Sequence, residues 1–148
     1  MADVVDKETR SRMMSGIRAK DTKPELVIRS ALHRAGFRFR LHRRDLPGTP
    51  DIVLPRYNAV INVHGCFWHY HGCKYSKVPE TRTDFWLKKL EANRDRDKKK
   101  SGELAVAGWR ELVVWECALR SGEWTIKELV ADITEWLEND SLATQIPA

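Results

Sequence analysis

Apolar residues recur along the chain at changing intervals, and each interval predicts a different element. After Thr22, four of them follow one another at helical spacing: Leu26, Ile28, Ala31 and Leu32. Thr22 can cap this helix, Pro24 and Glu25 fit its first turn, and Gly36 suits its end. The pattern predicts a helix between Thr22 and Gly36 with one apolar face.

Period-two alternation replaces helical spacing in the next segment. The run FRFRL predicts a strand whose alternate residues point inward, namely Phe37, Phe39 and Leu41. Two apolar runs then follow, DIVL at 51–54 and AVINV at 59–63, and the intervening PRYN predicts that they form a hairpin. With Tyr57 near the centre of the turn, Asp51 is expected opposite Val63.

The second half of the chain completes an alternating order of elements. Residues 83–100 are expected to be helical, and WRELVVWE at 109–116 predicts a third buried strand. Residues 124–138 predict an amphipathic helix with six apolar residues on one face: Ile126, Leu129, Val130, Ile133, Trp136 and Leu137. The order indicates an α/β fold with a mixed central sheet flanked by helices.

The length of 148 residues fits one domain with its own hydrophobic core. We expect a basic N-terminal arm or helix at 1–20, one domain at 21–140 and a tail at 141–148. The arm has little apolar content to bury.

No apolar run reaches the roughly 18 to 20 residues that cross a bilayer, and no secretion signal opens the sequence. A cytoplasmic protein is therefore expected.

Positive charge is concentrated in the first two-thirds of the sequence. Residues 1–50 carry 12 Lys/Arg against 6 Asp/Glu, residues 51–107 carry 11 against 7, and residues 108–148 carry 3 against 8, within a net charge of +5. This asymmetry favours a partner with a phosphate backbone, bound by one face of the domain. The alternative is that the basic excess only aids solubility.

The hairpin predicts a cation site at its open end. There the Asp51 carboxylate is expected beside the Val63 carbonyl. Both are hard oxygen ligands that suit Mg²⁺, which usually keeps several waters and completes its shell with phosphate oxygens. Such a site suits phosphodiester cleavage. The alternative is that Asp51 is a turn residue that ends the loop before the strand.

The segment VHGCFWHYHGC, with a later cysteine, offers a complete set of metal ligands. Three cysteines are an odd number in a chain expected to be cytosolic, so metal or thiolate roles are favoured over disulfides. Cys66, His71, Cys73 and Cys117 supply three thiolates and one imidazole, a closed tetrahedral set for structural Zn²⁺. The alternative is that the reduced cysteines simply pack in the core.

This zinc assignment leaves His64 and His69 beside the predicted Mg²⁺ site. A neutral imidazole is a good general base for activating water, and a second can stabilise charge on phosphate. Phe67 and Trp68 of the same loop can wedge between DNA bases. The alternatives are structural histidines, and aromatic rings that pack against the zinc site.

Polar residues interrupt the inward stripe of the helix at 83–100, which carries Trp86, Leu90, Asn93 and Asp97. Asp97 can hydrogen-bond an imidazole and fix its tautomer. Asn93, with Lys89 one turn earlier, can reach bases or phosphates. The alternative is an ordinary solvated helix face.

Several motifs together resemble the Vsr family of very-short-patch mismatch repair endonucleases. They are the Pro50-Asp51 start of a strand, VHGCFWH, the Cys/His pattern, TRTDFW, NRDRD and VVWECALR. The resemblance covers roughly residues 3–138. It implies a fold similar to type II restriction endonucleases of the PD-(D/E)xK type. It also implies Mg²⁺-dependent nicking of double-stranded DNA 5′ to the thymine of a T:G mismatch, which deamination of 5-methylcytosine produces.

The resemblance also implies roles for individual residues. Asp51 and the Val63 carbonyl would hold Mg²⁺, His69 would be the general base, and His64 would assist at the phosphate. Glu25 and Asp97 match supporting acidic residues. The four zinc ligands match the structural Zn²⁺ site, and the intercalating wedge matches Met14, Phe67 and Trp68. Lys89 and Asn93 match positions near the mismatch.

Two departures accompany the resemblance. The usual PD-(D/E)xK signature places an acidic residue and a lysine on the second strand, where NVHG has neither, so histidines must do the base chemistry. Position 63, often a hydroxyl residue in the family, is Val, and a carbonyl ligand survives this change.

Two alternative functions would require only part of these features. One is a zinc-stabilised, non-catalytic sensor of mismatched or distorted DNA, and the other is a nuclease for another DNA structure. For the mismatch endonuclease we expect a monomer that is associated with the nucleoid and has no membrane contact, with double-stranded DNA that contains a T:G mismatch and mismatch-repair proteins as partners.

Overall fold

The computed structural model describes residues 22–122, 124–139 and 143–147. The predicted arm at 1–20, with Met14, lies outside these residues. The helices are α2 (Lys23–Arg34), α3 (Thr83–Val106), α4 (Cys117–Arg120), α5 (Ile126–Glu138) and the 3₁₀ helix η1 (Pro55–Tyr57). The strands are β1 (Arg40–Leu41), β2 (Ile52–Leu54), β3 (Ala59–His64), β4 (Arg110–Trp115) and β5 (Gln145–Ile146). No helix in these ranges is both long and apolar enough to cross a membrane.

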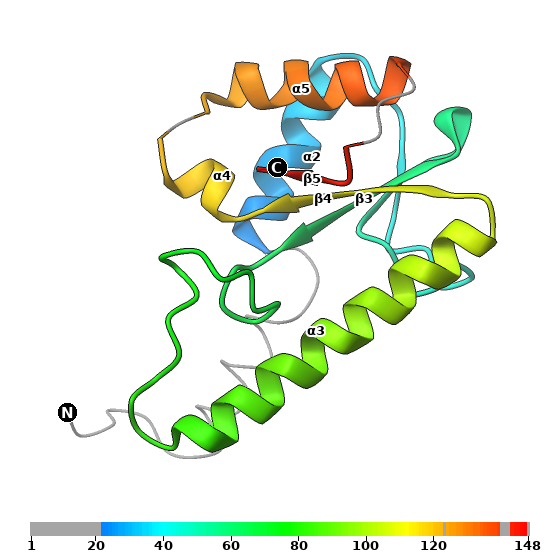
Figure 1. The fold of residues 1–148 in the computed structure, drawn as a ribbon. Helices are drawn as coiled ribbons and strands as arrows, with labels where there is room; N and C mark the ends of the chain where they lie inside the picture. The colour runs from blue at the N-terminus through cyan, green and yellow to red at the C-terminus, as the bar shows by residue number, and fades with distance from the viewer. Residues whose placement is uncertain (1–21, 123, 140–142, 148) are drawn as a thin grey trace.

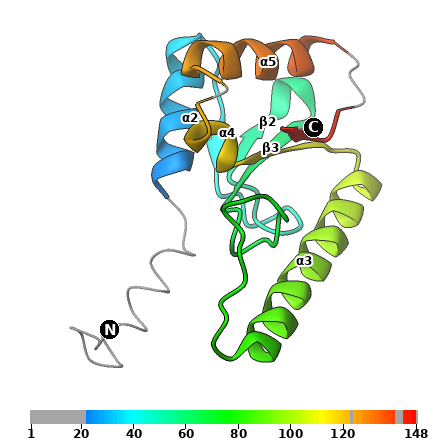
Figure 2. The ribbon, with the colours of Figure 1, turned by 60° about the vertical axis from the view of Figure 1, so that its left-hand side comes forward.

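The five strands form one sheet in the order β1-β2-β3-β4-β5. The first three are mutually antiparallel, whereas β3, β4 and β5 run parallel, so the sheet is mixed. Helices α2 and α5 lie on one side of the sheet and α3 lies on the other (Figure 1). The view in Figure 2 shows the same separation. The prediction of a mixed sheet flanked by helices is confirmed.

The two faces of the sheet bury different cores because successive strand residues point in opposite directions. Ile52 and Leu54 of β2 face the larger core beneath α2 and α5. Val53 faces the smaller core, where it packs with Val60 and with Leu104 near the end of α3. The larger core fixes α2 on the sheet, and the smaller one anchors the C-terminal half of α3.

Helix α2 begins as predicted, because the Thr22 hydroxyl accepts a hydrogen bond from the Glu25 N–H at 3.5 Å. Ile28 and Leu32 are buried against α5 and the sheet, but Leu26 is 42% exposed. Leu26 therefore does not share the apolar face of Ile28 and Leu32. Leu26 and Ile28 are separated by roughly 200° around the helix axis, so both cannot point into the same core.

The strand predicted over FRFRL is limited to its last two residues. The Phe37 N–H donates to the Leu32 carbonyl at 3.1 Å, so Phe37 belongs to the end of the helix. Phe37 is buried and Phe39 is half-buried, but Leu41 is 39% exposed, contrary to the prediction that it points inward. β1 is an edge strand, and its residues have only one neighbouring strand to cover them.

The hairpin between β2 and β3 forms, but its register differs from the prediction by one residue. Ile52 pairs with Ile61 and Leu54 pairs with Ala59, which leaves Asp51 across from Asn62 rather than Val63. The connection is the predicted segment at 55–58, but its centre lies between Arg56 and Tyr57 rather than at Tyr57, and this moves the pairing by one residue.

The second half of the chain contains two elements beyond the prediction. α4 follows β4 directly, and β5 forms within the segment expected to be a tail, pairing parallel to β4. Helix α3 also continues to Val106, past the predicted end at residue 100. The strand expected at 109–116 and the amphipathic helix expected at 124–138 are present as β4 and α5, although Ile126 of α5 is 42% exposed.

Candidate active site

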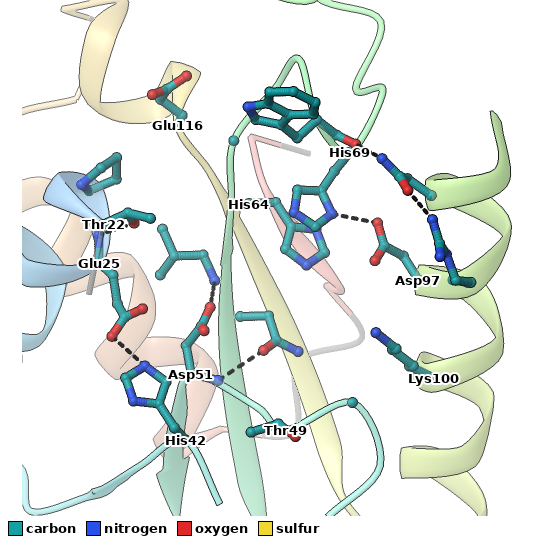
Figure 3. A pocket seen from close by; sticks show the side chains of 18 of the residues that line it. Thr22, Glu25, His42, Thr49, Asp51, His64, His69, Asp97, Lys100 and Glu116 are labelled. Atoms are coloured by element: carbon teal, nitrogen blue, oxygen red, sulfur yellow. Dashed lines mark hydrogen bonds and ion pairs between the residues drawn. The ribbon is translucent and has the colours of Figure 1, made fainter. Parts of the chain in front are cut away.

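An open cleft of 1230 Å³ lies between the end of β3, the start of α2 and the middle of α3. Its wall includes all six residues predicted for catalysis or Mg²⁺ binding: Glu25, Asp51, Val63, His64, His69 and Asp97. Figure 3 shows Glu25 and Asp51 on one side of β3 and the two histidines with Asp97 on the other. The fold thus brings together residues that are up to 72 positions apart.

Asp51 is held by backbone and side-chain contacts at the start of β2. Its Oδ2 accepts the Val63 N–H at 2.8 Å, and its own N–H donates to Asn62 Oδ1 at 3.0 Å. The carboxylate therefore contacts the Val63 N–H. The sequence had predicted that it lies beside the Val63 carbonyl. The His64 carbonyl accepts from Glu116 N on the β4 side. Because carbonyls alternate along a strand, the Val63 carbonyl faces the Asp51 side.

Burial raises the pKa of Asp51 to about 6, and the nearby Glu25 carboxylate adds to this effect. The Val63 N–H, His42 and His69 act in the opposite direction, because each favours the ionised form. A bound cation would also favour the carboxylate. The chemistry of this position therefore fits a divalent metal ligand.

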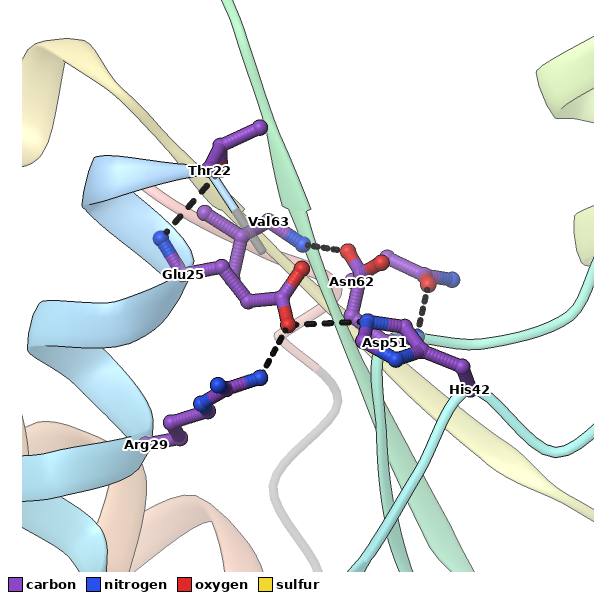
Figure 4. Close-up of polar contacts among 7 residues, drawn as sticks. All are labelled: Thr22, Glu25, Arg29, His42, Asp51, Asn62 and Val63. Atoms are coloured by element: carbon purple, nitrogen blue, oxygen red, sulfur yellow. Dashed lines mark hydrogen bonds and ion pairs between the residues drawn. The ribbon is translucent and has the colours of Figure 1, made fainter. Parts of the chain in front are cut away.

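Glu25 is the second acidic residue of the cleft, and it is 2% exposed. Its Oε2 accepts from Arg29 Nη1 at 3.0 Å and lies 2.8 Å from His42 Nε2. Figure 4 shows the Glu25 carboxylate in contact with both Arg29 and the His42 ring. The ligand atoms of Glu25, His42 and Asp51 all lie within 4.8 Å of one another, which is close enough for a shared cation.

His69 is oriented by helix α3. Its Nδ1 lies 2.6 Å from Asp97 Oδ2, so the ring carries a proton on Nδ1 and leaves Nε2 to act as a base. The predicted contact between Asp97 and an imidazole is present. This arrangement of base and orienting carboxylate is typical of sites that remove a proton from water or a hydroxyl.

His64 stacks on His69 with ring centroids 3.8 Å apart and planes 5° apart. Burial lowers the pKa of His64 to about 3, and the adjacent His69 contributes in the same direction. His64 is consequently neutral at physiological pH. Its Nδ1 is buried without a hydrogen-bond partner among the described residues. A neutral ring can offer an N–H donor but no positive charge.

Cys66, His71, Cys73 and Cys117 form a separate cluster at the end of β4. Their ligand atoms lie within 4.8 Å of one another, and Cys117 Sγ is 3.6 Å from His71 Nδ1. Burial raises the pKa of the Cys66 and Cys117 thiols and lowers that of His71, which favours the neutral, metal-binding imidazole. Trp115 stacks on His71 at 4.0 Å. The cluster can hold a metal ion that joins loop 65–76 to β4 and α4.

Phe67 and Trp68 pack against helix α3 rather than against the cysteine cluster. Their ring centroids are 5.0 Å apart, and each ring contacts Trp86, at 5.6 Å and 6.1 Å. Lys89 Nζ lies 5.8 Å from the Trp68 ring. Asn93 donates to the Trp68 carbonyl at 3.1 Å. Phe67, Trp68 and Asn93 line the cleft, while Lys89 is outside its wall.

Several residues of the cleft were not predicted from the sequence. His42 follows the FRFRL run directly, and its place beside Asp51 is set by the pairing of β1 with β2. Asn62 donates to Glu111 Oε2 at 2.6 Å, so it links Asp51 to β4. Lys100 is one turn after Asp97 on the cleft side of α3. Only the sequence position of His42, next to a predicted strand, offered a signal.

Comparisons with known proteins are consistent with this arrangement. Residues 2–75 match the family described as DNA mismatch endonuclease Vsr. The chain is 54% identical over 119 residues to the type II nicking enzyme V.XorIIP of Xanthomonas oryzae, covering 80% of this chain and 88% of that protein. It is 46% identical over 147 residues to the DNA mismatch endonuclease Vsr of Escherichia coli, covering 99% and 94%. It is also 43% identical over 121 residues to V.NmeAIP of Neisseria meningitidis, covering 82% and 86%.

Proposed function

Because the chain belongs to the Vsr family of DNA mismatch endonucleases, we propose that it nicks double-stranded DNA 5′ to the thymine of a T:G mismatch, with Mg²⁺ as cofactor. The supporting observation is that one cleft contains Asp51 beside Val63 and, across β3, a His69 imidazole oriented by Asp97. A hard-cation site next to an oriented base suits hydrolysis of a phosphodiester.

Asp51 and the Val63 carbonyl would hold the Mg²⁺ ion, and Glu25 lies close enough to accept hydrogen bonds from its waters. When bound, Mg²⁺ would stabilise negative charge on the scissile phosphate and lower the pKa of a bound water. The donor set fits a hard cation because the Glu25 and Asp51 carboxylates, which are hard oxygen ligands, have oxygens within 4.8 Å of each other.

His69 would take the proton of the attacking water through Nε2. Asp97 holds Nδ1–H, so it keeps the tautomer that leaves Nε2 free and stabilises the imidazolium that forms. His64 would donate an N–H to a phosphate oxygen. In-line attack on phosphorus then breaks the bond to the 3′ oxygen, and the products are a 3′-hydroxyl and a 5′-phosphate.

Recognition of the mismatch would use aromatic residues in the wall of the cleft. Phe67 and Trp68 would enter the base stack with Met14 of the N-terminal arm, and Trp86 would support them from α3. Lys89 and Asn93 would act near the mismatch. The ligation of Zn²⁺ by Cys66, His71, Cys73 and Cys117 would fix the loop that carries these rings.

A strand-resolved nicking assay tests this function. Labelled duplexes with a T:G mismatch in several methyltransferase-site contexts are incubated with the full chain and Mg²⁺, beside a matched duplex. The expected result is a nick immediately 5′ to the thymine, absent with EDTA and absent from the matched duplex. Mismatch binding without a nick in any context or metal would instead support the non-catalytic sensor. Cleavage only of branched DNA would support a nuclease with another target.

A further inference from the structure

His42 joins the two acidic residues of the proposed cation site through two different contacts. Its backbone N–H donates to the Asp51 carbonyl at 3.2 Å, which extends the pairing of β1 with β2 by one residue. Its side chain reaches in the other direction, to Glu25 Oε2 at 2.8 Å. One residue is thereby tied to the backbone of one acidic residue and to the side chain of the other.

The local conformation of His42 indicates that this placement is constrained. His42 has a φ of 48°, in the left-handed region that non-glycine residues adopt at some energetic cost. Its side chain is 13% exposed and points toward α2 rather than into solvent. The turn after β1 therefore carries strain that is offset by the contacts of His42 with Asp51 and Glu25.

The Glu25 carboxylate needs such a contact because it is buried beside a second carboxylate. Burying a charged carboxylate is unfavourable unless donors compensate it. Arg29 and His42 both act on Oε2, Arg29 from within α2 and His42 from the sheet side. Of these two contacts, the one from His42 ties Glu25 to the sheet that carries Asp51, whereas Arg29 belongs to α2 like Glu25 itself.

We propose that His42 is a positioning residue for cation binding: its Nε2–H holds the Glu25 carboxylate beside Asp51, so that both face one divalent cation. This inference rests on the proposed function, which identifies the site as a cation site. Binding of the cation can nevertheless be measured without DNA cleavage. Partners of metal-site carboxylates fix the direction of the oxygen atoms and raise the affinity for the ion. His42 acts through Glu25 and does not touch the substrate.

Binding of Mn²⁺ alone to the full chain tests the inference, with the unbound ion counted by electron paramagnetic resonance. In His42→Ala, Mn²⁺ affinity is expected to fall by about tenfold or more. His42→Gln keeps a donor of similar reach and should bind Mn²⁺ nearly as the parent does. Asp51→Asn, which removes a proposed ligand, shows how much of the binding belongs to this site. His33→Ala is the matched control, because His33 lies on the exposed side of α2.

A double-mutant cycle shows whether the effect of His42 on Mn²⁺ affinity depends on Glu25. If His42 acts through Glu25, adding His42→Ala to Glu25→Gln should lower Mn²⁺ affinity no further. Unchanged affinity in His42→Ala would overturn the proposal. Equal losses in His42→Ala and His42→Gln, or full additivity with Glu25→Gln, would also overturn it, since a merely structural role predicts them. A parent chain that binds Mn²⁺ but nicks no mismatched duplex would refute the proposed function and leave the role of His42 intact.

Discussion

The Asp97 carboxylate lies 2.6 Å from His69 Nδ1, and this contact joins the histidine-rich loop to helix α3. The two residues are 28 positions apart in sequence. The contact fixes both the tautomer and the direction of the His69 ring, which stacks on His64. The proposed base is thus oriented by a rigid helix although it is itself on a loop.

Replacing Asp97 with Asn should lower the rate of nicking by about 10- to 100-fold, because the amide holds the His69 tautomer poorly. Mismatch binding should change little. The check is single-turnover nicking with excess enzyme. Asp95→Asn is the matched control, since Asp95 is exposed on the same helix. An unchanged rate in Asp97→Asn would remove the orienting role.

Mg²⁺ dependence should vary with pH through Asp51. Its pKa is raised to about 6 by burial, so below that pH the proton competes with the cation. At limiting Mg²⁺, nicking should fall as the pH drops through about 6. Excess Mg²⁺ favours the ionised form and should move the midpoint to lower pH. Rates measured from pH 5 to 8 at two Mg²⁺ concentrations check this. If the pH midpoint of nicking does not change with Mg²⁺ concentration, the titrating group is not Asp51.

Loss of the cysteine cluster should destabilise the domain. Cys117→Ser is expected to abolish binding of one Zn²⁺ per chain and to lower the free energy of unfolding by on the order of several kcal/mol. Zinc content and thermal unfolding are the measurements. His71→Ala should behave like Cys117→Ser, whereas His33→Ala should not. Retention of full zinc content by both cluster variants would exclude this ligand set.

Phe67→Ala or Trp68→Ala should reduce the preference for mismatched over matched duplex while leaving Mn²⁺ binding intact. The reason is that the rings line the cleft as part of an aromatic cluster and are not among the residues of the proposed cation site. Competition binding with the two duplexes measures the preference. Trp124→Ala, which alters a ring packed against the core instead, is the control. Parent-like preference in both loop variants would argue against the wedge.

Two leucines of α2 should differ in their contribution to stability. Leu32 is fully buried, so Leu32→Ala should cost about 2–5 kcal/mol. Leu26 is 42% exposed, and Leu26→Ala should cost far less. Chemical denaturation of both variants measures the difference. Equal losses would contradict the orientation of α2 against α5.

Part of the candidate site could be predicted from sequence because its chemistry is written in local motifs. VHGCFWHYHGC contains both proposed histidines and three of the four cluster ligands, so their residue types indicated metal and acid–base roles. Thr22 and Thr125 also act as helix caps through their own hydroxyls, an effect that depends on residues three positions away. Such features need no information about distant parts of the chain.

The sequence by itself determined the element types and the kinds of side chain available for chemistry, since periodicity, capping and turn residues act within a few positions. Only the tertiary structure decided which of these meet. The pairing of β2 with β3 puts Asp51 across from Asn62, and the packing of Ile28 and Leu32 in the core leaves Leu26 exposed. The pairing of His42 with Glu25, 17 positions away, arose the same way. These contacts depend on how sheet and helices pack together, and local periodicity carries no information on that.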